Sequence, residues 1–133
     1  MTAMPKDLLD VARNMRELAY APYSKFHVGA AIRGVKGAVY GGCNVENAAY
    51  PVGACAEAGA ISAMVAGGET RIAEILIISS GPDMVTPCGA CRQRIREFSG
   101  PDTIVHMCCD DGCGTSVKLS ELLPHSFGPE FLK

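Results

Sequence analysis

The sequence predicts an α/β sandwich in which helices pack on a mixed sheet of about five strands. Three observations favour this class: an amphipathic N-terminal segment, the unbroken apolar run Ile75–Ile78, and the alternation of helix-like and strand-like segments along the chain. At 133 residues, with 48% hydrophobic and 20% charged residues, the chain has the composition of a globular protein. We therefore expect one domain spanning residues 1–133.

The first half of the chain predicts a helix, a hairpin and a second helix. In Pro5–Tyr20, apolar residues recur every three or four positions, which is the pattern of a helix that covers one side of a core. Phe26–Ile32 and Ala38–Gly42 flank glycine turn residues and predict the two strands of a hairpin. Gly53–Gly67 is small and apolar and stops at a glycine pair, so it predicts a tightly packed helix.

The second half predicts strands that alternate with helices. Ile72–Ser79 contains the apolar run and is expected to be a central strand covered on both faces. A helix from Cys88 to Phe98 leads to the strand-like run Thr103–Cys108, which predicts a parallel, right-handed crossover. A short strand at Ser116–Leu119 and a short helix at Leu119–Leu123 complete the prediction.

Three cysteines and one glutamate have the spacing of a catalytic metal site. Cys88 and Cys91 form a C-x-x-C turn, which lets two sulfurs converge on one tetrahedral ion, and Cys55 offers a third thiolate. Zinc with three protein ligands keeps its fourth position open. Glu57 can face that position and move protons without binding the metal. Thiolate ligands without an oxidation-state requirement favour zinc, and we expect one Zn²⁺ per chain.

Other interpretations of the cysteines stay open. The three candidate ligands are alternatively small buried hydrophobes or disulfide partners. A second alternative is a non-catalytic zinc module in which Cys43 closes the coordination sphere, an arrangement that needs no carboxylate. The other cysteines are expected to fill the core and a turn instead of binding a second metal: Cys43, Cys108, Cys109 and Cys113.

Charge and terminal sequence narrow the class of partner. A net charge of −2 argues against a nucleic-acid partner, because binding to a phosphate backbone needs a basic surface. No stretch approaches the roughly 20 apolar residues of a membrane span. Charged residues interrupt Met1–Asp10, which therefore does not predict a secretory signal. With seven cysteines and no such signal, we expect a cytoplasmic protein with reduced thiols.

The chain resembles the small cytidine deaminases that act on free nucleosides. The matching stretches run nearly from end to end in the family's order: Ala21–Phe26, Asn44–Ala48, Cys55–Glu57, Pro87–Gln93, Leu122–Pro124 and Ser126–Glu130. The resemblance implies a three-layer α/β/α fold, a homotetramer and one zinc ion per chain. It also implies hydrolytic deamination of cytidine and 2′-deoxycytidine, a step of pyrimidine salvage, in which zinc-activated water attacks C4 and Glu57 transfers protons.

The resemblance implies further contacts to a nucleoside substrate. Asn44 and Glu46 would bind the ribose, Phe26 would pack beside the base or ribose, and the backbone at Ala56 would contact the base edge. Phe127 would reach into the site of a neighbouring subunit. From residue chemistry alone, the polar loop around Asn44 predicts an ordinary turn, and the two phenylalanines predict core positions.

One position departs from the family pattern. Many relatives carry Arg directly after the catalytic Glu, where its side chain can hydrogen-bond to the zinc thiolates, but this chain has Ala58. We expect Arg92, next to Cys91, to compensate the thiolate charge instead. The departure also keeps open a deaminase of another aminated base or of a cytosine-containing nucleoside antibiotic.

Overall fold

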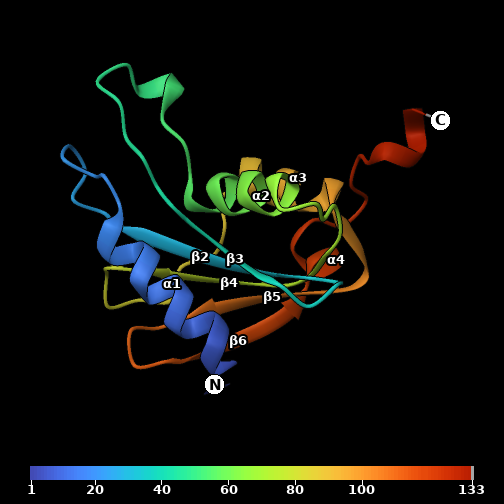
Figure 1. The fold of residues 1–133 in the computed structure, drawn as a ribbon, viewed down its shortest axis with the longest axis horizontal. Coiled ribbons are helices and arrows are strands. Elements are labelled where there is room, and N and C mark those ends of the chain that lie inside the picture. The colour runs from blue at the N-terminus through green and yellow to red at the C-terminus, as the bar shows by residue number, and fades with distance from the viewer. Residues whose placement is uncertain (133) are drawn as a thin grey trace.

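A single mixed sheet of six strands forms the centre of the computed structural model, which describes residues 1–132 (Figure 1). Its strand order is β1-β6-β5-β4-β2-β3. The strands are β1 (Thr2–Ala3), β2 (Val28–Gly34), β3 (Val39–Cys43), β4 (Ile72–Ser79), β5 (Ser99–Cys108) and β6 (Cys113–Lys118). The helices are α1 (Lys6–Leu18), α2 (Ala56–Ala66), α3 (Gly89–Glu97) and α4 (Leu119–Leu122), with short 3₁₀ helices η1 (Tyr50–Val52) and η2 (Pro129–Leu132).

The three layers follow from the alternation of buried residues along the strands. Ala31, Leu76 and Ile78 pack under α1 on one face of the sheet. Residues of opposite parity, such as Ile75 and Ile77, pack under α2 and α3 on the other face (Figure 1). The predicted α/β/α sandwich is therefore confirmed, and β4 is buried between both helix layers.

The predicted parallel pairing across the crossover is confirmed, and the number of strands is corrected from about five to six. β4 and β5 pair in parallel, while all other neighbours pair antiparallel. The additional strand is β1, which pairs with β6 at the edge of the sheet. With only Thr2 and Ala3, β1 is too short to show a strand periodicity in the sequence. Among the described residues, no helix is long and apolar enough to span a membrane.

Close packing between α2 and β3 fixes the start of α2. A Cβ atom on Gly42 would lie 2.2 Å from the backbone nitrogen of Ala60 and 2.5 Å from the carbonyl oxygen of Ala56. Only glycine allows this approach of helix and strand. The first turn of α2, which carries Glu57, is thereby held against the sheet.

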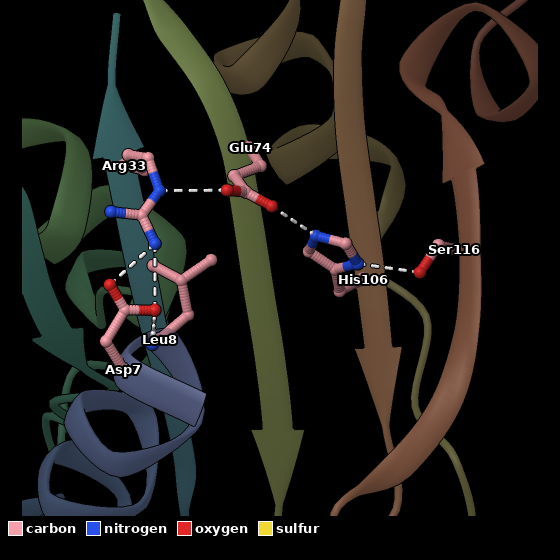
Figure 2. Close-up of polar contacts among 6 residues, drawn as sticks. All are labelled: Asp7, Leu8, Arg33, Glu74, His106 and Ser116. Atoms are coloured by element: carbon pink, nitrogen blue, oxygen red, sulfur yellow. Dashed lines mark hydrogen bonds and ion pairs between the residues drawn. The ribbon is translucent and has the colours of Figure 1, made fainter. Parts of the chain in front are cut away.

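A chain of polar side chains ties α1 to the sheet on the face opposite α2 and α3 (Figure 2). Arg33 on β2 donates to Glu74 Oε2 on β4 at 2.9 Å and pairs with Asp7 of α1 at 2.6 Å. The other Glu74 oxygen is hydrogen-bonded to His106 Nε2 at 2.7 Å, and His106 Nδ1 to Ser116 Oγ at 2.6 Å. The network therefore spans four strands and the N-terminal helix.

We expect Glu74→Gln to destabilise the protein near neutral pH and to have less effect in acid. Burial alone raises the pKa of Glu74, but the His106 hydrogen bond and the Arg33 guanidinium outweigh it and hold the pKa below its ordinary value. A carboxylate with a lowered folded-state pKa stabilises the fold above its unfolded pKa of about 4.3, and this contribution is lost as the pH falls through the folded value. The loss near pH 7 should be roughly 1 to 3 kcal/mol.

Thermal unfolding between about pH 7 and pH 3 checks this prediction, since the Tm gap between wild type and variant should close on the acid side. Glu121→Gln, which removes an exposed carboxylate on α4, should track the wild type throughout. A Tm gap that stays constant over the whole range would contradict the assigned role of the Glu74 carboxylate.

Candidate active site

The N-termini of α2 and α3 bring the three predicted cysteine ligands together. Cys55 immediately precedes α2 and Cys88 immediately precedes α3, both with extended backbone, while Cys91 lies in the first turn of α3. The three Sγ atoms all lie within 4.8 Å of one another. Residues far apart in the sequence are thus assembled because the crossover from β4 returns α3 beside α2.

The donor set fits a zinc ion. Tetrahedral zinc–sulfur geometry places sulfurs about 3.8 Å apart, which is compatible with three Sγ atoms that all lie within 4.8 Å of one another. The backbone amides of Cys91 and Ala90 lower the pKa of Cys88, as expected at a helix N-terminus. Burial raises the pKa of Cys55 and of Cys91, so these thiols need a cation to stay ionised near neutral pH.

Within residues 1–132, no histidine, carboxylate or further cysteine joins the three cysteines as a fourth ligand. Cys43 lies on β3 outside it. Three protein ligands leave one coordination position of a tetrahedral ion open. The geometry therefore favours a catalytic centre over a closed structural site.

Glu57 is a buried carboxyl beside the cysteine cluster. It lies in the first turn of α2 and is only 4% exposed. Burial raises the pKa of Glu57, against smaller opposing effects from its own backbone amide, the Cys91 thiol and the Arg94 guanidinium. A carboxyl whose pKa is raised by burial is more easily protonated, so it can both accept and return a proton, which suits a general acid–base.

A cleft of about 590 Å³ opens over the cysteines and Glu57. This volume lies in the range of small-molecule sites. Seven of the residues that the sequence analysis assigns to the site line the cleft: Phe26, Asn44, Glu46, Cys55, Ala56, Glu57 and Cys88. Cys91 is fully buried and does not line it, although its sulfur belongs to the cluster.

Asn44 and Glu46 hold the loop together and also face the cleft. Asn44 accepts a hydrogen bond from the Val28 amide at 2.8 Å and donates one to the Phe26 carbonyl at 2.8 Å. Glu46 accepts from the amides of Tyr23 and Ser24 and pairs with the Ser24 hydroxyl. The Ser24 hydroxyl is the main cause that lowers the pKa of Glu46.

The turn interpretation and the site interpretation of this loop are thus compatible. An amide side chain retains a further donor hydrogen and acceptor lone pair after two hydrogen bonds, and a carboxylate retains about one lone-pair site after three. Both side chains are held rigidly by backbone contacts while keeping capacity to bind hydroxyl groups.

Several cleft residues other than Tyr50, which its place in the sequence put near the site, were not predicted. Tyr23 and Tyr50 line the cleft with ring centroids 6.0 Å apart, and Tyr23 belongs to the same short motif as Phe26. Val85 and Thr86 also line it and directly precede Pro87 and the C-x-x-C turn. Proximity in the chain could have indicated these residues. Ile77 also lines the cleft, but it comes from the central strand, where nothing distinguishes it from a core residue.

Arg92, the residue expected to compensate the thiolates, contacts backbone carbonyls instead. Its Nε donates to the Pro87 oxygen at 2.8 Å and its Nη1 to the Leu122 oxygen at 2.9 Å. The guanidinium beside a ligand sulfur belongs to Arg94, whose Nη1 lies 3.4 Å from Cys91 Sγ. On a helix, residues three apart share a face whereas adjacent residues do not, and this spacing was the signal that sequence reasoning missed.

Phe127 lies outside this cleft. The residue is 57% exposed, and its ring stacks on Phe131 with ring centroids 5.4 Å apart. The Phe127 carbonyl accepts a hydrogen bond from Gln93 of α3 at 2.9 Å. The C-terminal segment that carries Phe127 extends away from the sheet on the side of α2 and α3 (Figure 1).

Comparison with known protein families gives one match over most of the chain. Residues 3–108 match the model of the cytidine and deoxycytidylate deaminase zinc-binding region. A cytidine deaminase from Sporosarcina psychrophila is 38% identical over 125 residues, which cover 94% of this chain and 92% of the relative. A cytidine deaminase from Halalkalibacterium halodurans is 39% identical over 92% of this chain and 93% of its own length.

Solved structures share the fold as well as the sequence. The crystal structure of cytidine deaminase from Burkholderia pseudomallei superposes with a TM-score of 0.87 at 38% identity, covering 93% of this chain and 99% of that one. Cytidine deaminase from Mycobacterium tuberculosis superposes with a TM-score of 0.81 at 33% identity, covering 92% and 96%.

Proposed function

We propose that this chain, which belongs to the cytidine and deoxycytidylate deaminase family, hydrolyses cytidine and 2′-deoxycytidine to uridine and 2′-deoxyuridine with release of ammonia. The observation that carries the proposal is the cluster of Cys55, Cys88 and Cys91 beside the buried carboxyl of Glu57, at the base of a cleft of nucleoside size. Residues 1–133 act as one catalytic domain.

Cys55, Cys88 and Cys91 would hold the zinc ion as thiolates. Zinc supplies the Lewis acidity that turns water into a nucleophile near neutral pH. Glu57 takes the proton from the attacking water as the oxygen bonds to C4 of the cytosine ring, and delivers a proton to ring N3. It then carries the remaining proton of the new C4 hydroxyl to the departing amino group, the C4–N bond breaks, the C4 carbonyl forms, and ammonia leaves. Burial of Glu57 supports both roles, because its raised pKa makes the carboxyl easy to protonate.

Other cleft residues orient the nucleoside. Asn44 and Glu46 bind sugar hydroxyls through the donor and acceptor capacity that their loop contacts leave free. Phe26, 40% exposed at the cleft wall, packs beside the base or ribose. The backbone at Ala56, at the start of α2, contacts the base edge.

Turnover of cytidine and of 2′-deoxycytidine, followed by ultraviolet absorbance with metal content determined on the same sample, tests the proposal. We expect turnover with about one zinc per chain. Zinc without turnover of either nucleoside would redirect the assignment to another aminated base or to a nucleoside antibiotic, which a substrate panel identifies. Absence of both zinc and turnover would mean that the three cysteines are ordinary core residues and not metal ligands.

We further propose that the chain works as a homotetramer in the cytoplasm, taking free nucleosides in pyrimidine salvage. All seven cysteines are free thiols, which suits a reducing compartment. Exposed aromatic residues border the cleft and extend along the C-terminal segment: Tyr23, Tyr50, Phe127 and Phe131. A second subunit would bury such residues, and Phe127 would then complete the site of its neighbour.

Phe127→Ala is expected to lower kcat/KM by roughly 10-fold to 100-fold, because base–aromatic stacking contributes about 1 to 3 kcal/mol. Mixing this variant with Glu57→Gln subunits provides the matched control. After subunit exchange, sites that combine Glu57 of one chain with Phe127 of another are intact, so the mixture should exceed the mean activity of its two components. Activity equal to that mean would contradict a contribution across subunits.

A further inference from the structure

We propose that Arg94 is the charge-compensating residue of the cysteine cluster, acting on the metal through the sulfur of Cys91. This inference rests on the proposed function, because it presupposes a zinc ion held by the three thiolates. It assigns to Arg94 a positioning role, since the side chain contacts a metal ligand and lines no part of the substrate cleft.

The cluster carries an excess of negative charge that its surroundings must offset. Three thiolates on one divalent ion leave a net charge of about −1, and an ionised Glu57 adds another. Helix N-termini contribute an effective charge of about +0.5 each, and α2 and α3 both begin at the cluster. The helix ends therefore offset only part of the excess.

Arg94 supplies the remaining positive charge at the right place. Its Nη1 donates to Cys91 Sγ at 3.4 Å, and Cys91 is the fully buried member of the cluster. Among residues 1–132, it is the one cation with a hydrogen bond to a cluster sulfur. The same guanidinium also interacts favourably with the other two sulfurs, which raise the pKa of Arg94. It interacts favourably with Glu57 as well, because it lowers the pKa of that carboxyl.

The neighbouring positions cannot take this role. Arg92 uses its guanidinium to hold the Pro87 and Leu122 carbonyls. Ala58, which follows Glu57, carries no charge. A donor on a ligand sulfur withdraws electron density from the metal–sulfur bond and fixes the sulfur's position. Arg94 thus preserves the acidity of a metal that three thiolates would otherwise weaken.

Zinc affinity, measured by competition with a chromophoric chelator, tests the inference without relying on turnover. Arg94→Met keeps much of the side chain's length but removes the charge and the donors, and it should weaken zinc binding by about tenfold, the lower end of the range for such outer contacts. The zinc affinity of Arg94→Lys should fall between those of the wild type and Arg94→Met, because lysine keeps the charge but not the planar set of donors. Arg71→Met removes an equivalent charge that bonds the Ser99 carbonyl and no cluster sulfur, and it should bind zinc like the wild type.

A spectroscopic readout separates this role from a merely structural one. In the cobalt-substituted protein, the sulfur-to-metal charge-transfer band should shift in Arg94→Met and not in Arg71→Met. Because Arg94 is exposed on α3, its variants should fold, and Arg94→Gln provides a second neutral substitution.

The possible outcomes distinguish the inference from the proposed function. Wild-type zinc affinity together with an unchanged cobalt spectrum in Arg94→Met would overturn the role of Arg94 and leave the proposed function intact. A wild-type chain that binds no zinc would overturn the proposed function, and the inference with it. Weakened zinc binding in both Arg94→Met and Arg71→Met would mean that the overall charge of the protein, and not the contact with Cys91, causes the loss. That result would also overturn the inference.

Discussion

Glu57→Gln is expected to lower kcat by about 10²-fold to 10⁴-fold while zinc content and fold stay unchanged. Glutamine has nearly the shape of glutamate, so the buried position in α2 remains filled. It cannot accept a proton from water or return one to the substrate, which is the work that the proposed reaction assigns to this carboxyl. The measurement is steady-state turnover of cytidine together with zinc content and thermal unfolding.

A matched substitution in the same cleft sharpens this test. Glu46→Gln makes the same chemical change at a cleft carboxylate that we propose binds the sugar, so it should act mainly on KM. If Glu57→Gln also raised KM and spared kcat, Glu57 would be a binding residue. If it left turnover intact, the site would not be a deaminase of the proposed mechanism.

The fold was largely predictable because its signals are local. The apolar run in Ile72–Ser79 reproduces β4 residue for residue, and helical periodicity gave α1 to within two residues at each end. Such patterns report which side of an element is buried, and burial decides the layers. β1 was not predicted because two residues are too few to show a strand periodicity. Its pairing also depends on β6 at the other end of the chain.

The cysteine cluster was predictable for a similar reason, whereas only part of the cleft around it was. The C-x-x-C spacing and the position of Glu57 after Cys55 are properties of short stretches. Ile77, for example, reaches the cleft only once the sheet and its loops are assembled. The role of Arg94 was predictable only in part. Its spacing from Cys91 can be read in the sequence, but only the structure shows which arginine reaches a sulfur.

Cys91→Ala is expected to abolish zinc binding and to reduce turnover below detection. The substitution removes one of three ligands, and the remaining two cannot hold zinc in the geometry of a catalytic site. Because Cys91 is fully buried and alanine is only slightly smaller, the direct packing loss should be small. The stability lost should therefore be mostly that contributed by bound metal, which stabilises the folded state by RT ln(1 + c/Kd), where c is the concentration of free zinc.

Chelator-dependent thermal unfolding isolates that contribution. A strong chelator should lower the Tm of the wild type to about the value of Cys91→Ala, and should leave the Tm of Cys91→Ala unchanged. Cys43→Ala is the matched control, because Cys43 is half-buried on β3 but lies outside the sulfur cluster. It should keep zinc, turnover and the chelator response. Loss of zinc from Cys43→Ala would instead mean that a fourth thiolate closes the coordination sphere, which leaves no position for water and makes the centre structural.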